Sequence, residues 1–231
     1  MLFRKPRKIL TVRAKSSLRL RSRWALALAV CAFPHNVRAE EEAPKDKPAE
    51  RRSGLVIGLT AGISLSGASG YPNDIQKIDK PQYYSSSPLL VGSTSGITVM
   101  GALSDVFNFG VMFTGNSSVG NDRWKSSVTG VGFRVEAFPL YSVRPWLRDL
   151  GFFGQFGVGV AQLQAQGGSY PAAEGVQSYV GLGTFYEWNV ARFLGGHLAL
   201  GPSIEAAVMT SRPIEHHYGA LSFRIVFYGG K

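Results

Sequence analysis

Two adjacent histidines, His216 and His217, are the first residues whose type could support catalysis. A histidine can act as a general base near neutral pH. The residues around the pair alternate between apolar and polar, which predicts a strand, and consecutive strand residues point to opposite faces. At most one of the two can therefore serve a given site. No serine stands two residues after either histidine and no acid is placed to orient one, so we predict a surface or interfacial role without catalysis.

The sequence contains no pattern typical of a metal, cofactor or phosphate site. No cluster of His, Cys and carboxylate residues has the spacing of metal ligands. The glycine pairs are not followed by Gly-Lys-Ser or Gly-Lys-Thr, nor by a predicted helix, so they do not form a phosphate-binding loop. We therefore expect neither a metal nor a cofactor.

Five charged residues interrupt stretches that are otherwise rich in glycine and apolar residues. Each occupies the smaller-residue side of an alternating pattern, and together they come from four segments: Arg134, Glu136, Glu187, Glu205 and Arg224. If one fold brings these segments together, opposite charges can pair. We predict an internal ionic network, with a gated ion path as the alternative. His197 lies on the same side and is expected to help fill the space.

The beginning of the chain has the layout of a secretory signal peptide. Residues 1–39 contain ten Lys and Arg and no acid, and they include the ten-residue apolar run Trp24–Phe33. That run is shorter than the ~20 residues that a membrane-spanning helix needs. Small residues before the predicted cut favour cleavage between Ala39 and Glu40. The sequence therefore predicts export.

The net charge of +10 belongs to this signal peptide. The full chain has 25 Lys and Arg against 15 Asp and Glu, and loss of the ten leading basic residues leaves 15 of each. No basic stripe remains to bind nucleic acid. The only cysteine, Cys31, lies in the same leader, so the mature chain can form no disulfide. A lipidated Cys31 is the minor alternative, because Val30 stands where lipoprotein processing expects a small residue.

Two further regions follow the predicted cut. Residues 40–53 (EEEAPKDKPAERRS) carry many charges and no aromatic or branched apolar residue, which predicts a flexible periplasmic leader. From residue 54 to residue 231 the composition shifts to glycine, serine, aliphatic and aromatic residues without helical periodicity. We predict a single all-β domain there.

Apolar residues recur at every second position along this domain, which is typical of strands. The pattern is clearest where Leu55, Ile57 and Leu59 alternate with small residues. Eight strands are predicted: Leu55–Ser66, Leu89–Leu103, Phe107–Gly115, Thr129–Ala137, Phe152–Gln164, Val180–Val190, Leu198–Val208 and Leu221–Phe227. A turn near residues 93–96 would raise the count to ten.

The small-residue side of these strands predicts a membrane barrel. A soluble sheet normally carries long polar side chains on its wet face, whereas glycine dominates the less apolar face here. Small residues suit a narrow lumen, and an arginine facing lipid near the midplane would cost ~2–4 kcal/mol. We expect an interfacial aromatic girdle near the periplasmic turns: Phe107, Phe138, Trp146, Phe152, Trp188, Phe193, Phe227 and Tyr228.

Over residues 54–228 the chain resembles the eight-stranded outer-membrane barrels of the OmpA/OmpX type. The most specific feature is the last strand, where Leu221, Phe223, Ile225 and Phe227 alternate toward an aromatic end. The resemblance implies a closed antiparallel up-and-down transmembrane barrel in the outer membrane of a Gram-negative envelope. It also implies that the insertion machinery reads the last strand. The chain departs from the family by continuing to Lys231.

These observations favour an outer-membrane barrel with a filled lumen and no enzymatic activity, acting in a structural, adhesive or envelope role through its outer loops. Its expected partners are outer-membrane lipid and the insertion machinery, while the ligand of the loops is unknown. One alternative is a small lipid-modifying enzyme, since lipid A deacylases are barrels of this size that use a histidine and a serine. A narrow ion-conducting channel and a soluble β-protein are the others.

Overall fold

The computed structural model describes residues 52–120, 123–168 and 170–230. Eight long strands dominate it: β1 (Gly54–Gly70), β3 (Leu90–Ser104), β4 (Phe107–Gly120), β5 (Trp124–Ala137), β6 (Leu150–Ala165), β7 (Ala173–Tyr186), β9 (Gly196–Thr210) and β10 (Ile214–Tyr228). Four short elements accompany them: β2 (Ser85–Ser86), β8 (Trp188–Phe193) and two 3-10 helices, η1 (Pro81–Tyr83) and η2 (Pro145–Leu147). The domain is all-β, as predicted.

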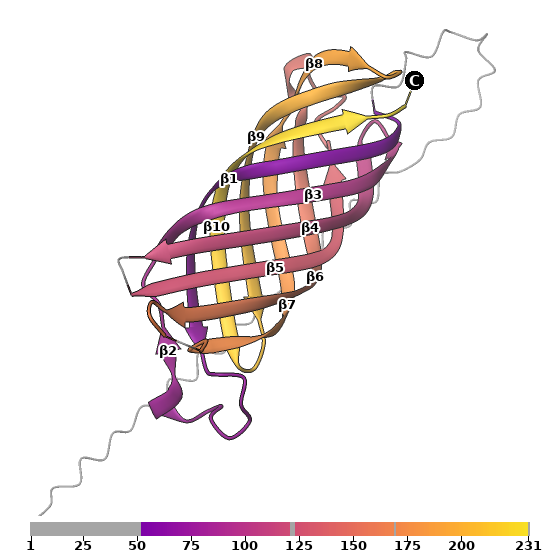
Figure 1. The fold of residues 1–231 in the computed structure, drawn as a ribbon. Helices are drawn as coiled ribbons and strands as arrows, with labels where there is room; N and C mark the ends of the chain where they lie inside the picture. The colour runs from indigo at the N-terminus through magenta and orange to yellow at the C-terminus, as the bar shows by residue number, and fades with distance from the viewer. Residues whose placement is uncertain (1–51, 121–122, 169, 231) are drawn as a thin grey trace, which may run out of the picture. The chain divides into compact units, whose positions relative to one another are not determined.

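The eight long strands close into a ring (Figure 1). Each pairs antiparallel with the long strand before and after it in the chain, and β10 pairs with β1 as well as with β9. Closure leaves the barrel with no free sheet edge, which is the condition for a sheet to exist in lipid. The predicted closed, up-and-down, eight-stranded barrel is confirmed.

The strand register sets the width of this barrel. Directly paired residues can be followed around the ring from Leu59 through Ile97, Phe113, Val131, Val158, Ser178, Thr210 and Glu215 to Ser69. The path ends ten residues further along β1 than it began, so the ring has a shear of ten. Eight tilted strands enclose a lumen just wide enough for side chains.

The short strand β8 continues the line of β7 and does not add a ninth strand to the barrel wall. Phe185 of β7 pairs with Ser203, and Trp188 of β8 pairs with Leu200, so both follow one register along β9. Opposite the break stands Pro202, which has no N–H to donate to a ladder. The ten-strand alternative is wrong, because β3 runs unbroken through the position of the suspected turn.

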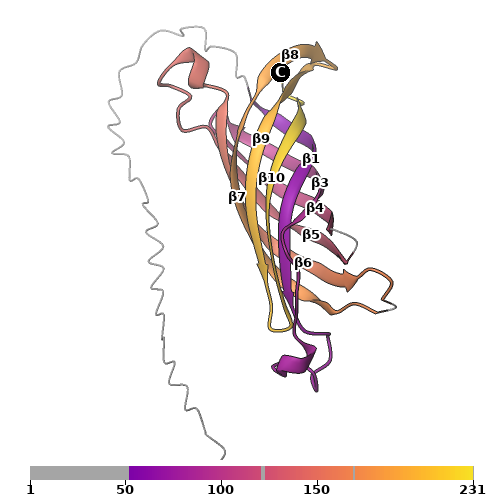
Figure 2. The same cartoon turned by 90° about the vertical axis from the view of Figure 1, so that its left-hand side faces the viewer.

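We call the end of the barrel where β1 begins and β10 finishes the base, and the opposite end the rim. The base carries the connections 105–106, 138–149 and 194–195, and the β8–β9 hairpin projects from it (Figure 2). The rim carries the connections 71–89, 121–123, 166–172 and 211–213. The longest of these, 71–89, contains β2 and η1.

No helix in the described part of the chain is long and apolar enough to cross a membrane.

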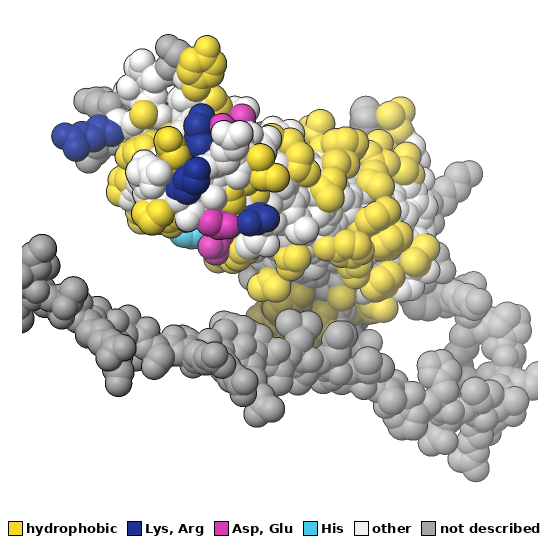
Figure 3. Space-filling model, turned by 90° about the horizontal axis from the view of Figure 1, so that it is seen from below, with side chains coloured by type: hydrophobic (Ala, Val, Ile, Leu, Met, Phe, Trp, Pro, Cys, Tyr) yellow, Lys and Arg dark blue, Asp and Glu magenta, His cyan; other side chains and the backbone are white. Residues whose placement is uncertain are grey.

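The outward faces of the strands are apolar around the barrel. Leu59, Phe156 and Leu182 are each more than half exposed, and many other outward aliphatic and aromatic residues are exposed as well. On the face seen in Figure 3, hydrophobic side chains cover the wall, while charged side chains gather toward the rim. Such a wall is stable only against an apolar solvent, so the barrel is of the transmembrane type.

Part of the predicted aromatic girdle is wrong. Trp146, Phe152 and Trp188 are well exposed, as expected, but Phe138 and Tyr228 are fully buried. Phe138 follows β5 and folds under the base, and Tyr228 has the inward register of β10. Both rings fill the lumen and do not contact lipid.

Two glycines of β6, Gly154 and Gly157, test the register because they face opposite sides of the barrel wall. A Cβ on inward-facing Gly157 would lie 2.2 Å from the backbone oxygen of Val131, whereas one on outward-facing Gly154 would meet nothing within 4 Å. Gly157→Val should therefore lower the free energy of unfolding by about 1–3 kcal/mol. Gly154→Val should change it by less than about 0.5 kcal/mol. Urea titration of the folded barrel in lipid measures both, and equal effects would contradict the register.

Candidate functional site

Charged and aromatic side chains fill the lumen at the base. Arg52, which precedes β1, is only 2% exposed, and its guanidinium lies 2.7 Å from a carboxylate oxygen of Asp149 and 3.7 Å from one of Glu187. Its backbone N–H donates to the carboxylate of Asp105 at 2.8 Å. The residue is therefore fixed to two turns of the base and to a luminal carboxylate. The sequence had placed it in the flexible leader.

Glu136 of β5 is the central acceptor above this contact. Its carboxylate accepts hydrogen bonds from Arg134 at 2.8 Å and from Asn108 at 3.1 Å. Arg224 of β10, on the other side of the lumen, donates to it at 3.2 Å. Three strands are thus joined through one buried carboxylate, which would be costly to bury without these donors.

Glu187 joins the central group to the base. One carboxylate oxygen lies 3.2 Å from the guanidinium of Arg224, and the other accepts a hydrogen bond from the hydroxyl of Tyr228 at 2.8 Å. Because Arg52 also approaches Glu187, a continuous set of charged contacts runs from Asp149 to Arg134. We call this set the luminal charge network.

The guanidinium of each arginine of the network lies over the ring of a phenylalanine. The guanidinium carbon is 3.6 Å from the ring centroid of Phe138 for Arg52, 3.6 Å from Phe153 for Arg134 and 3.7 Å from Phe185 for Arg224. A phenyl face attracts a desolvated cation and excludes water from it. Phe138, Phe153 and Phe185 also pack on one another. The base is thereby filled with arginines and rings in alternation.

Hydrogen bonds continue the network toward the rim. Arg134 donates to Gln155, Gln155 donates to the hydroxyl of Tyr179, and Tyr179 lies 3.1 Å from the hydroxyl of Tyr218. Both tyrosines contact the carboxylate of Glu205. Glu205 therefore joins the network through phenols and has no direct contact with an arginine among the described ion pairs.

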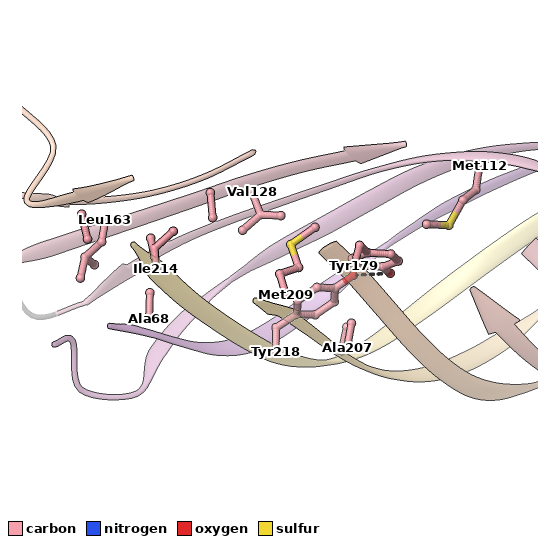
Figure 4. Close-up of a cluster of buried hydrophobic side chains, with 12 residues drawn as sticks. Ala68, Met112, Val128, Leu163, Tyr179, Ala207, Met209, Ile214 and Tyr218 are labelled. Atoms are coloured by element: carbon pink, nitrogen blue, oxygen red, sulfur yellow. Dashed lines mark hydrogen bonds between the residues drawn. The ribbon is translucent and has the colours of Figure 1, made fainter. Parts of the chain in front are cut away.

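The rim half of the lumen contains a cluster of buried apolar side chains (Figure 4). Met112, Tyr179 and Tyr218 lie toward its middle, and a cluster of buried aliphatic side chains continues toward the rim: Val128, Ala161, Leu163, Ala173, Met209 and Ile214. Each of these residues is at most 4% exposed.

The five luminal residues chosen from the sequence share one interior. Arg134, Glu136, Glu187 and Arg224 are in direct contact, and Glu205 is linked to them through Gln155 and the two tyrosines. His197, the sixth residue expected inside, stacks on the ring of Tyr228 at 4.8 Å. The predicted cleavage site at Ala39 and Glu40 lies outside the described residues.

The two histidines are divided between the faces of β10, as the alternation requires. His217 is exposed on the outer wall, where its ring covers Gly67. His216 is 0% exposed in the lumen, so its predicted surface or interfacial position is wrong. No described hydrogen bond connects His217 with an acid or a hydroxyl, so the parts of a nucleophilic site are not assembled there.

Comparison with solved structures found similar barrels, among them the following three. Neisserial surface protein A is 11% identical with a TM-score of 0.51, over 77% of this chain and 98% of that one. Ail, the attachment invasion locus protein of Yersinia pestis, is 10% identical with a TM-score of 0.47, over 76% and 99%. OprG of Pseudomonas aeruginosa is 10% identical with a TM-score of 0.34, over 77% and 96%.

No protein-family model and no curated protein sequence matches the chain. At these identities the similarity concerns the fold. The chain has the fold of an eight-stranded outer-membrane barrel, which confirms the resemblance and the membrane class predicted from the sequence.

Because the luminal charge network is buried, loss of one of its charges should measurably lower the free energy of unfolding. Arg224→Met removes the cation shared by Glu136 and Glu187, which are 0% and 2% exposed at their side chains, and should lower the free energy of unfolding by about 3–5 kcal/mol. The matched control is Arg212→Met, whose 2.8 Å ion pair with Asp79 is 72% and 64% exposed. Urea midpoints should show no measurable change for the control. Similar losses for both variants would contradict a network stabilised by burial.

Proposed function

We propose that this protein is a non-conducting barrel of the outer membrane that acts in a structural or adhesive role through its rim. The observation that carries the proposal is the filled lumen, which is buried from Arg52 at the base to Ile214 near the rim. A solute could cross only by displacing paired charges and close-packed apolar residues. Any contact with a partner therefore belongs on the outside of the barrel.

The rim is the end that we expect outside the cell. Outer-membrane barrels place their long loops outside and their short turns in the periplasm. The longest connection of the chain, 71–89, is at the rim, and two of the three base connections are two-residue turns. The base also holds the start of β1 and the end of β10. The exception is the base connection 138–149, which folds under the lumen and fills its mouth.

The rim loops form a defined surface. The backbone N–H of Tyr71 donates to Pro213 at 2.6 Å, and Tyr71 accepts from the N–H of Glu174, so the 71–89 and 211–213 loops are joined to the start of β7. The rings of Tyr71 and Tyr84 meet edge to face at 5.3 Å. Near them, a hydrogen bond from Arg212 to Asp79 raises the pKa of that guanidinium. Aromatic and charged groups held in place are suited to binding a partner.

The proposed partners follow from the outer wall. Its exposed apolar side chains fit membrane lipid, and Leu221, Phe223 and Ile225 of β10 are all more than 40% exposed on that wall. A last strand with this outward row supports the proposal that the insertion machinery reads it. The lipid-modifying alternative has little support, because the described residues near His217 form no hydrogen-bonded nucleophile and base.

Planar-bilayer recording tests the filled lumen. Folded full-length protein, verified by its shifted migration on an unboiled gel, should insert without giving steady current, because no continuous aqueous path crosses the network. The measurement is the conductance per inserted barrel in 1 M KCl, with a known open barrel as the positive control. Reproducible single-channel steps from the wild type would replace this proposal with the channel alternative.

Cysteine labelling on intact cells tests the orientation. A membrane-impermeant maleimide should modify Gln76→Cys in the 71–89 loop, since this exposed residue is at the rim. The matched variant Ser142→Cys, exposed at the base, should react only after the outer membrane is permeabilised. Labelling of the base variant on intact cells, with no labelling at the rim, would show that the barrel is inverted.

A further inference from the structure

We infer that the rim half of the lumen contains a closed hydration chamber, in which water molecules hydrogen-bond Ser66, Gln177 and His216. The inference goes beyond the proposed role at the rim and does not depend on it. It begins with buried polar atoms that have no hydrogen-bond partner in the described chain: the hydroxyls of Ser66 and Ser126, the side-chain carbonyl of Gln177 and both ring nitrogens of His216. Buried polar atoms in folded proteins are almost always paired.

Three of these side chains converge from different strands. The amide nitrogen of Gln177 donates to the backbone oxygen of Ile214 at 2.6 Å, so the β7 side chain reaches across to β10. His216 follows two residues later on the same inward face. Ser66 of β1 pairs with Tyr218, the next inward residue of β10. In the strand register, His216 therefore lies between Ile214, which Gln177 contacts, and Tyr218, which Ser66 opposes.

The polar surface continues from Ser66 along β1, β4 and β5. Asn116 donates to the hydroxyl of Ser64 at 2.7 Å and accepts from Ser118 at 3.0 Å. Ser126, with its unpaired hydroxyl, is the strand partner of Ser118. One side of the chamber is thus polar over three strands.

Apolar and aromatic groups close the chamber at both ends. Toward the rim, Leu163 and Ile214 are each at most 1% exposed and lie at the end of the cluster in Figure 4. Ala173, the strand partner of Leu163, is also buried. Toward the base, the paired hydroxyls of Tyr179 and Tyr218 lie across the lumen. A molecule held between these layers would be isolated from both solutions.

The unpaired atoms specify what kind of molecule fits. The Gln177 oxygen needs a hydrogen-bond donor, and a neutral imidazole needs one donor and one acceptor. A serine hydroxyl can pair with either kind of group. A metal ion could bind the imidazole lone pair and the glutamine oxygen, but it would leave the imidazole N–H without an acceptor. The described residues also include no group of three His, Cys, Asp or Glu side chains that could hold a metal. An anion could not satisfy the glutamine oxygen. Water both donates and accepts, and buried waters typically make about three such bonds.

A double-mutant cycle tests whether His216 and Ser66 share a hydrogen-bonded occupant. His216→Phe, Ser66→Ala and the double variant are compared with the wild type in the full chain, by urea titration in lipid. If water bridges the two residues, the first substitution already removes most of the stabilisation that the second would remove. The product of the two single effects on the folding equilibrium constant should exceed the effect of the double variant by about threefold or more.

The outer wall supplies the control cycle. His217→Phe and Ser69→Ala alter diagonal neighbours on the same two strands, β10 and β1, but facing lipid. Their effects on the folding equilibrium constant should multiply within experimental error. Multiplicative effects in the inner cycle as well, with His216→Phe more stable than the wild type, would mean that each unpaired atom is simply buried dry.

Direct detection of the water decides the question. In isotope-labelled full-length protein in micelles, the ring protons of His216 should show magnetisation transfer from long-lived water, while those of Phe156, which faces outward on the wall, should show none. If His216 gives no transfer under conditions where a surface histidine does, the chamber is dry and the inference fails. That outcome would leave the filled lumen and the rim proposal untouched.

Discussion

The pairing of β10 with β1 is the constraint on which the rest of the molecule depends. It closes eight strands with a shear of ten, so every strand has two neighbours and the lumen has one narrow width. Alternation then assigns each side chain to a face, and the charged residues of the strand centres point inward, away from lipid. Inward groups meet across a short distance, where a large residue on one strand requires a glycine on another. Gly183, packed against the ring of Phe153, shows this compensation.

Burial of charge inside such a ring requires several partners for each group. Glu136 has two arginines and an amide, and Arg224 is shared by two carboxylates and lies on a phenylalanine ring. Pairs of this kind seldom add stability over an apolar core, yet removing one member leaves an unpaired charge. The network therefore specifies one arrangement of the strands around the base. Arg52 extends this specification to the chain just before β1, which it fastens to Asp105 and Asp149.

Alternation predicted the fold and most of the luminal charges, because a period of two assigns faces without knowledge of the partners. The same rule could have placed His216 inside, since it has the same parity as Arg224. Arg52 could not be found this way, because it precedes the first strand and its partners lie about 50 to 130 positions later. The same parity could have placed Tyr228 inside, because it ends β10 in the inward register. Phe138 lies just beyond the end of β5, where alternation no longer applies, and its contact with the guanidinium of Arg52 accounts for its place under the barrel.

The luminal side chains are held more strongly in the base half than in the rim half, and this difference bears on function. In the base half, movement of one strand would break several ion pairs at once, so that half is expected to be rigid. The rim half holds Met112 and Met209, small residues and neutral polar groups, whose rearrangement costs less. A partner at the rim could therefore adjust loops and the upper lumen without disturbing the base. In the proposed role, binding at the rim need not open a pore, because the charge network at the base would stay intact.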